Sequence, residues 1–187
     1  GCPDHRQARN QNTARHESVS WWFAMRRSRR MLAALALLSG CAQTGAGEEA
    51  TLPVDALYGG SQCGDLERPT TVWIASAAEW RSWHGRIVSP QMSLPSPPMV
   101  DFSREGVLLV AMGTRPSAGY GLSLAGASAT VRDGVLSVRV NWREPPPGYR
   151  QAQVVTSPCL ALKVPAVPFA RITVLDLEGR TRLEGAR

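Results

Sequence analysis

Apolar and polar positions after residue 70 follow the two patterns that are typical of β-strands: alternation with a period of two, and short uninterrupted apolar runs. Residues 107–113 form the clearest apolar run, which is too short for a typical helix and predicts a buried central strand. The complete set of predicted strands covers residues 70–74, 107–113, 120–131, 135–142, 151–155, 159–164 and 171–177.

One helix is predicted directly after the first of these strands. Ser76 and Glu79 have the spacing of a capping box, in which the serine caps the helix and the glutamate reaches back. Helical spacing then gives the helix a heavily apolar face formed by Trp80, Trp83, His84 and Ile87. We interpret this aromatic face as core packing, with a ligand-stacking platform as the alternative. His84 flanks it and is expected on the helix surface or partly buried, and not as a ligand.

Turn residues divide the strands. Asp133-Gly134 predicts a hairpin, whereas the proline-rich segments 93–98 and 144–148 predict irregular connections. We therefore expect a mainly β, β-rich α+β fold: an antiparallel, sandwich-like sheet with one short helix. A single domain is predicted over residues 57–187.

The chain has 187 residues with a formal net charge of +6, and 43% of its residues are hydrophobic. This hydrophobic content supports a packed core, whereas 19% charged residues are too few for a coiled coil. Residues 1–40 contain seven arginines and two acidic residues, so +5 of the charge precedes Cys41. Because the other basic residues are scattered singly, no nucleic-acid partner is expected.

The charged leader has the pattern of a lipoprotein signal peptide, predicted over residues 25–40. A basic segment at 26–30 precedes eight apolar residues at 31–38, which are too few to span a bilayer. The sequence Leu-Ser-Gly-Cys at 38–41 resembles the bacterial lipobox, so Cys41 is the expected lipidation site and the membrane an expected partner. Ala42, where aspartate would favour retention in the inner membrane, implies the periplasmic face of the outer membrane in the bacterial cell envelope.

The segments on either side of this leader are not predicted to belong to the domain. Residues 1–24 are polar and precede Met25, the natural start, so we interpret them as an upstream extension from a mistaken start. Residues 41–56 are small and polar, which is typical of a flexible tether.

Cysteine usage leaves one pair in the domain, Cys63 and Cys159. In an oxidising compartment, we favour a disulfide that ties the start of the domain to a late strand. The alternative is a reactive thiol with His84 as its base.

Residues 101–165 resemble the C-terminal domain of the PrcB family of protease-complex subunits. The shared pattern is an apolar strand, the sequence Gly-Thr-Arg-Pro-Ser-Ala-Gly-Tyr at 113–120, the proline-rich segment 145–148, and Thr-Ser-Pro-Cys from 156 to Pro165. The family's loop more often has threonine and glycine where this chain has Ser117 and Ala118. The resemblance implies a non-catalytic lipoprotein that stabilises a surface protease.

The loop in this pattern is the candidate binding site. Its glycines would expose backbone N–H groups, its proline would fix the entry, and its arginine and tyrosine would offer a charge and a ring. The candidate residues are Gly113, Arg115, Pro116, Ser117, Gly119, Tyr120 and Gly121. The alternative is a tight connection between strands that needs glycine for packing.

The leading functional hypothesis is a non-enzymatic envelope lipoprotein that binds or stabilises a partner protein, such as a protease. No catalytic residue, metal site or cofactor is predicted, because the histidine and acid spacings fit no metal set and no nucleophile motif occurs. One alternative is a periplasmic small-ligand or glycan-binding module that stacks ligands on Trp73, Trp80, Trp83 or Trp142. A hydrolase is the other, and it would require His84 close to Cys159 or a serine.

Overall fold

The computed structural model describes residues 49–64, 66–88, 95–148 and 150–187. The chain divides into two units, Gly1–Ala42 and Gln43–Arg187, and all described residues belong to the second. The predicted upstream extension, the signal peptide and the lipidation site Cys41 therefore lie outside the described residues. Among the described residues, no helix combines the length and apolarity that crossing a bilayer requires.

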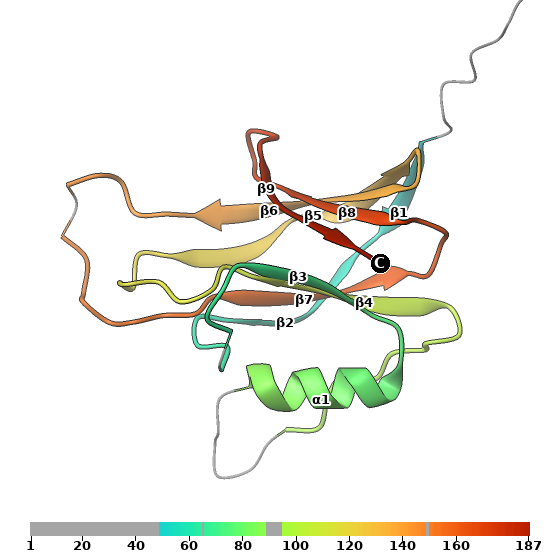
Figure 1. The fold of residues 1–187 in the computed structure, drawn as a ribbon, viewed down its shortest axis with the longest axis horizontal. Coiled ribbons are helices and arrows are strands. Elements are labelled where there is room, and N and C mark those ends of the chain that lie inside the picture. Colours follow the sequence, from blue (N-terminus) through green and yellow to red (C-terminus); the bar gives the residue numbers. More distant parts are fainter. Residues whose placement is uncertain (1–48, 65, 89–94, 149) are drawn as a thin grey trace, which may run out of the picture. The chain divides into compact units, whose positions relative to one another are not determined.

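Two β-sheets pack face to face, and a helix covers the outer face of one of them (Figure 1). The five-stranded sheet has the order β1 (Ala50–Pro53), β5 (Gly121–Arg132), β6 (Val135–Arg143), β8 (Arg171–Leu175) and β9 (Thr181–Ala186). The four-stranded sheet has the order β2 (Asp55–Gly60), β7 (Cys159–Pro165), β4 (Glu105–Ala111) and β3 (Thr70–Ile74). The helix is α1 (Ala77–Ile87). The predicted fold class, a β-rich sandwich with one short helix, is confirmed.

The uninterrupted apolar run of β4 is explained by burial on both faces. Leu108 and Val110 face the core between the two sheets, whereas Val107 and Leu109 pack in the second core with α1. All four side chains are fully buried, and β4 lies between β7 and β3. A strand in this position has no solvent face on which polar residues could alternate. The predicted buried central strand is thus confirmed.

The capping box and the aromatic face of α1 also form as predicted. The Glu79 amide donates to Ser76 Oγ at 3.2 Å, and the Glu79 carboxylate accepts from the Ala75 amide at 3.1 Å. Trp80 is only 2% exposed, and its indole N–H donates to the Pro98 carbonyl at 3.0 Å. The interpretation of this face as core packing is therefore correct.

The pairing of strands is mostly antiparallel. Asp133 and Gly134 have φ values of 51° and 73°, as the two central residues of a tight hairpin turn require, and join β5 to β6. One pair departs from the expected antiparallel arrangement, because β6 and β8 are parallel. The connection between them contains β7, which belongs to the other sheet.

The predicted tether and the start of the domain require correction. Residues 50–56 form β1 and the first part of β2, so the folded domain begins at Ala50 and not at residue 57. β1 is short and ends at Pro53, and only Leu52 of its residues is buried. With so few buried positions the segment shows no strand pattern in the sequence. Glu49 is exposed and precedes β1, and residues 41–48 of the predicted tether lie outside the described residues.

Two predicted strands near the C-terminus also differ. Residues 151–155 form no strand, because the segment leaves both sheets and most of its side chains are exposed. β8 ends at Leu175, two residues earlier than predicted, and β9 follows it without having been predicted. β9 lies at the edge of its sheet and has no fully buried residue, so its sequence lacks a strong apolar pattern.

Asp176 closes the turn between β8 and β9. Its carboxylate is buried and accepts hydrogen bonds from the backbone amides of Glu178 and Arg180 at 3.1 and 2.8 Å. The guanidinium Nε atoms of Arg180 and Arg182 each lie 2.9 Å from the same carboxylate. Burial by itself would raise the pKa of Asp176, but these hydrogen bonds outweigh it and lower the pKa to about 2.

This shift predicts how stability depends on pH. An aspartate in the unfolded chain titrates near ~3.9, so ionised Asp176 stabilises the fold above about pH 4, and this stabilisation is lost as the pH falls towards about 2. We expect Asp176→Asn to lower the melting temperature at about neutral pH, with the difference from wild type shrinking between about pH 4 and pH 2. Thermal unfolding followed by circular dichroism measures both. A difference that stays constant over this range would contradict the prediction.

Candidate functional site

The candidate loop lies at the end of the sandwich where β4 finishes and β5 begins. The connection between β6 and β7, residues 144–158, leaves the sheets at this same end (Figure 1). We call residues 113–121 and the described part of 144–158 together the loop end. Both segments belong to the stretch in which the sequence resembles PrcB.

Backbone hydrogen bonds join the two segments of the loop end. The Arg115 amide donates to the Thr156 carbonyl at 2.7 Å, and the Thr156 amide donates to the Arg115 carbonyl at 2.9 Å. The Thr156 hydroxyl is buried and donates to the Ser117 carbonyl at 3.0 Å. The Ala118 amide donates to the Ala152 carbonyl at 3.1 Å. The two segments therefore hold each other in place and present one surface.

Gly113 is required by the fold. Its φ is +76°, and a Cβ atom there would lie 2.7 Å from backbone atoms of both Arg68 and Pro69. The next amide, that of Thr114, donates to the Glu67 carbonyl at 2.9 Å. The amides of residues 114, 115 and 118 therefore all donate within the domain.

The other two glycines allow close approach by neighbouring groups. A Cβ atom at Gly119 would lie 2.8 Å from Cβ of Pro145, which belongs to the other segment of the loop end. At Gly121 it would lie 2.8 Å from a guanidinium nitrogen of Arg143. Gly121 therefore leaves room for the Arg143 side chain to lie across β5.

The predicted charge and ring are only partly available at the surface. The guanidinium of Arg115 lies over the Tyr120 ring, 5.5 Å from its centre, and its Nε atom is buried without a hydrogen-bond partner among the described residues. Tyr120 itself packs against the core between the sheets. Ser117 is buried, whereas Pro116 is exposed.

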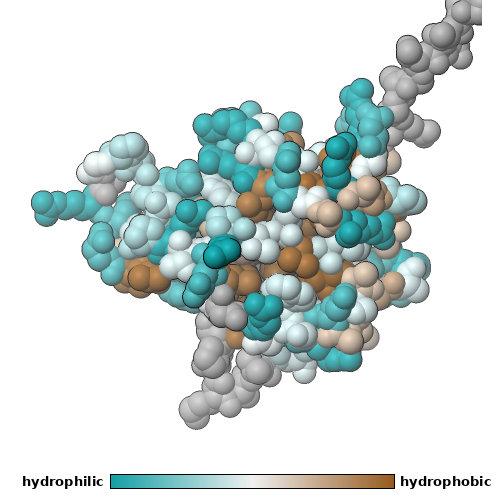
Figure 2. All heavy atoms as spheres, in the orientation of Figure 1, coloured by the Kyte–Doolittle hydropathy of each residue, from teal (hydrophilic) through white to brown (hydrophobic). Residues whose placement is uncertain are grey.

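Sequence reasoning missed two exposed apolar side chains at the loop end. Val154 is 52% exposed and Val155 is 61% exposed. A hydrophobic patch is visible at this end of the domain in the space-filling view (Figure 2). The sequence interpretation placed both valines in a strand, and no local signal distinguishes an exposed valine pair from a buried one.

Three surface depressions surround the loop end. One of about 330 Å³ lies between Gly60 and Ser61 on one side and Tyr120 and Gly121 on the other, and Arg143 also lines it. A second, of about 480 Å³, is lined by residues that include Pro116, Ser117 and Arg150. The smallest, about 210 Å³, is lined by residues that include Gly119, Arg143 and Glu144. These open hollows suit contact with another molecule's surface better than enclosure of a small ligand.

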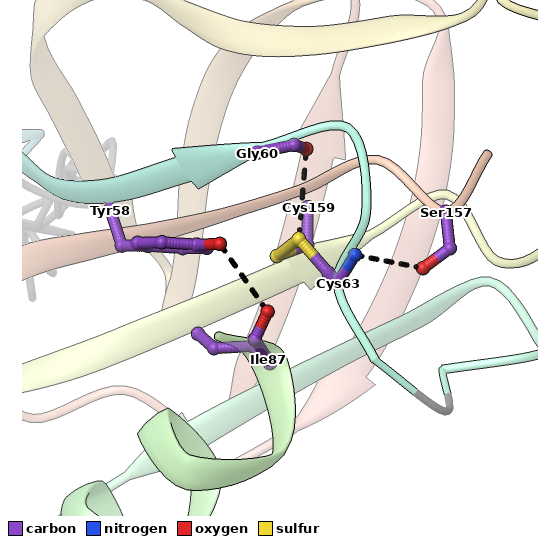
Figure 3. The surroundings of a disulfide bond; sticks show 6 residues. All are labelled: Tyr58, Gly60, Cys63, Ile87, Ser157 and Cys159. Atoms are coloured by element: carbon purple, nitrogen blue, oxygen red, sulfur yellow. Dashed lines mark hydrogen bonds between the residues drawn. A yellow bond between two sulfur atoms is a disulfide. The ribbon is translucent and has the colours of Figure 1, made fainter. Parts of the chain in front are cut away.

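A disulfide between Cys63 and Cys159 fixes the base of the loop end (Figure 3). The Cys63 amide donates to both the hydroxyl and the carbonyl oxygen of Ser157, at 3.1 and 2.9 Å. Cys63 Sγ also lies 3.6 Å from the Gly60 carbonyl oxygen. Because the sulfur carries no proton in the disulfide, this contact is not a hydrogen bond. The predicted disulfide is confirmed, and Cys159 is not available as a free nucleophile.

His84 is enclosed by aromatic rings. It is 4% exposed, with its ring centre 5.3 Å from that of Trp80 and 6.2 Å from that of Tyr58. Burial lowers the pKa of this imidazole, because the charged form is desolvated. Because Cys159 is held in the disulfide, the hydrolase hypothesis loses the cysteine that it needed beside His84. Within the described part of the chain, no cluster of histidine, cysteine and acidic residues could hold a metal ion.

The four tryptophans proposed as stacking faces do not form a concave platform. Trp80 and Trp142 are buried, and Trp73 and Trp83 are partly buried against the two cores. None of the three depressions described above is lined by a tryptophan. This arrangement disfavours the glycan-binding alternative.

Comparison with known proteins supports the family resemblance. Residues 107–165 match the family model described as PrcB C-terminal, so the chain carries a PrcB-type domain. The match runs from Val107 in β4 to the end of β7 and contains the whole loop end, about a third of the chain. Neither the curated proteins nor the solved structures yielded a match.

Proposed function

We propose that this chain is a non-enzymatic envelope lipoprotein that binds and stabilises a partner protein, a protease, through its loop end. The match to the PrcB C-terminal family supports association with a protease complex. The matched stretch contains both loops of the surface in question.

The observation that carries the proposal is the exposure of two adjacent valines on a well-held loop. Val154 and Val155 are each more than half exposed and lie two residues and one residue before Thr156, whose backbone and hydroxyl are both hydrogen-bonded. Apolar side chains held in water by an ordered backbone lose little conformational entropy when a partner covers them. An exposed apolar pair of this kind is typical of the apolar part of a protein interface.

The position at which the chain enters the domain fits membrane anchoring. Ala50 pairs with Val131, near the end of β5 that is opposite to Gly121 and the loop end. If Cys41 carries the lipid, the eight residues 42–49 can span at most about 30 Å. Anchoring would then hold the domain close to the membrane by a strand that begins away from the loop end.

Site-specific photo-cross-linking tests this proposal in the cell envelope. We expect a cross-linking amino acid at Val155 to capture one protein reproducibly, identified by mass spectrometry as a protease or a protease-bound subunit. The matched control is the same amino acid at Met99, which is 97% exposed and lies before β4, outside the loop end. With Cys41→Ser, we expect the protein to leave the membrane fraction and the Val155 adduct to decrease.

Two results would contradict the proposal. One is the absence of any adduct that depends on Val155, because a partner covering this patch must come within reach of the probe. The other is equal capture of the same proteins from Val155 and Met99, which would indicate non-specific contact.

A further inference from the structure

The loop end carries positive charge that the domain leaves unpaired. Arg143 and Arg150 line its depressions, and neither makes an ion pair or hydrogen bond within the described part of the chain. One acidic residue, Glu144, lines the smallest of these depressions together with Arg143. Its two oxygens are already bonded, one to the Trp142 indole N–H at 3.1 Å and the other to Arg182 at 3.3 Å.

The placement of Arg143 is built into the strand pair. Arg143 of β6 faces Gly121 of β5 in the antiparallel register. Because Gly121 has no side chain, the guanidinium lies over its backbone, with Nη2 and Nε 2.8 and 3.1 Å from the position of a Cβ. The charged group therefore borders two depressions at once, those of about 330 and 210 Å³.

These features identify the chemistry of the partner surface. We propose that the loop end binds an acidic stretch of the partner protein, with an apolar side chain against Val154 and Val155 and carboxylates of Asp or Glu on Arg143 and Arg150. This inference rests on the proposed function and specifies its partner. Guanidinium groups bind carboxylates through paired, charge-assisted hydrogen bonds, so unpaired arginines on the same loop end as an exposed apolar pair select acidic neighbours of an apolar residue.

A peptide titration tests the inference without the natural partner. The probe is an N-acetylated, C-amidated heptapeptide of alternating Glu and Leu, titrated into the full-length chain carrying Cys41→Ser. We expect backbone NMR signals of residues 150–155 and of Gly121 to shift, and the affinity to fall several-fold between about 50 and about 300 mM salt. The same peptide with Gln in place of Glu should bind at least about tenfold more weakly.

Variants of the chain identify the charges responsible. Arg143→Gln and Arg150→Gln should each weaken binding of the Glu peptide, and the double variant should abolish its salt dependence. Gly121→Ala should weaken it without removing any charge, because the new Cβ displaces the Arg143 guanidinium. The matched control is Arg139→Gln, an exposed arginine on the same strand that lines a different hollow, and it should leave binding unchanged.

Several outcomes would overturn the inference. Equal binding of the Glu and Gln peptides would show that carboxylates are not recognised, and the absence of shifts at the loop end would show that this surface does not bind acidic segments. If the Gln peptide with a free C-terminus bound as well as the Glu peptide, the surface would recognise a chain terminus instead. A partner captured at Val155 combined with any of these results leaves the proposed function intact, whereas loss of that capture contradicts the proposed function itself.

Discussion

Reduction of the Cys63–Cys159 disulfide is expected to lower the free energy of unfolding by about 4 kcal/mol. The two cysteines are 96 residues apart, and closing a loop of this length in the unfolded chain corresponds to about 4.5 kcal/mol in the chain-entropy model. For a domain of this size, such a loss lowers the melting temperature by roughly 10 °C or more. Urea unfolding of the oxidised and reduced chain measures the difference.

A second variant separates the cross-link from the packing of the sulfur atoms. Both cysteines are fully buried in the core beneath α1, so Cys63→Ala with Cys159→Ala removes packing as well as the cross-link. We expect this double variant to be less stable than the reduced wild type by about 1–2 kcal/mol, because the small cavities add to the cost. Reduction that changed stability by less than about 1 kcal/mol would contradict the entropic argument.

The disulfide also connects stability to the candidate surface. Cys63 holds Ser157 through two hydrogen bonds, and the neighbouring Thr156 joins the two segments of the loop end. After reduction we expect amide hydrogen exchange to accelerate first at Arg115 and Thr156. The surface would therefore loosen before the sheets separate, because its bonds depend on few buried contacts.

Some strands could be predicted from the sequence because their apolar or β-branched residues suit only one position, the interior of a sheet sandwich. β3 was predicted with its observed bounds, and the apolar run of β4 could only suit a strand covered on both sides. Among the edge strands, β3 was predicted, whereas β1, β2 and β9 were not, because these three bury few side chains and their pairing is decided by the partner strand. A strand was wrongly predicted at residues 151–155, because Val154 and Val155 are strand-forming residues that here lie on an exposed loop.

The sequence and the structure draw attention to the same region of the chain, but to different residues within it. The glycine-rich pattern drew attention to residues 113–121, yet Gly113 and Gly119 serve close approach between backbone segments. The groups that remain available for a partner are Val154, Val155, Arg143 and Arg150, which no motif marks. The exposure of the valines and the lack of ion pairs at the arginines among the described residues depend on how the rest of the chain folds, and the spacing of residues along the chain does not indicate either.

Gly113→Ala is expected to destabilise the domain by about 3 kcal/mol or more, the second large effect. The left-handed backbone conformation at φ +76° costs a non-glycine residue about 1–2 kcal/mol. The new Cβ would in addition meet backbone atoms of Arg68 and Pro69 at 2.7 Å, where no flexible side chain can move aside. The segment from Glu67 to Pro69 must shift, which breaks the hydrogen bond from the Thr114 amide to the Glu67 carbonyl.

Gly134→Ala is the matched control, because it isolates the backbone strain from the steric clash. Gly134 has nearly the same φ, +73°, but a Cβ there meets nothing within 4 Å. We expect it to cost only about 1–2 kcal/mol, so urea unfolding of the two variants yields the contribution of the close approach by difference. If both alanine variants lost the same stability, the contact of Gly113 with residues 67–69 would not restrain the loop. A larger loss in Gly113→Ala, accompanied by weaker cross-linking from Val155, would show that the glycine acts on binding by holding the loop end in shape.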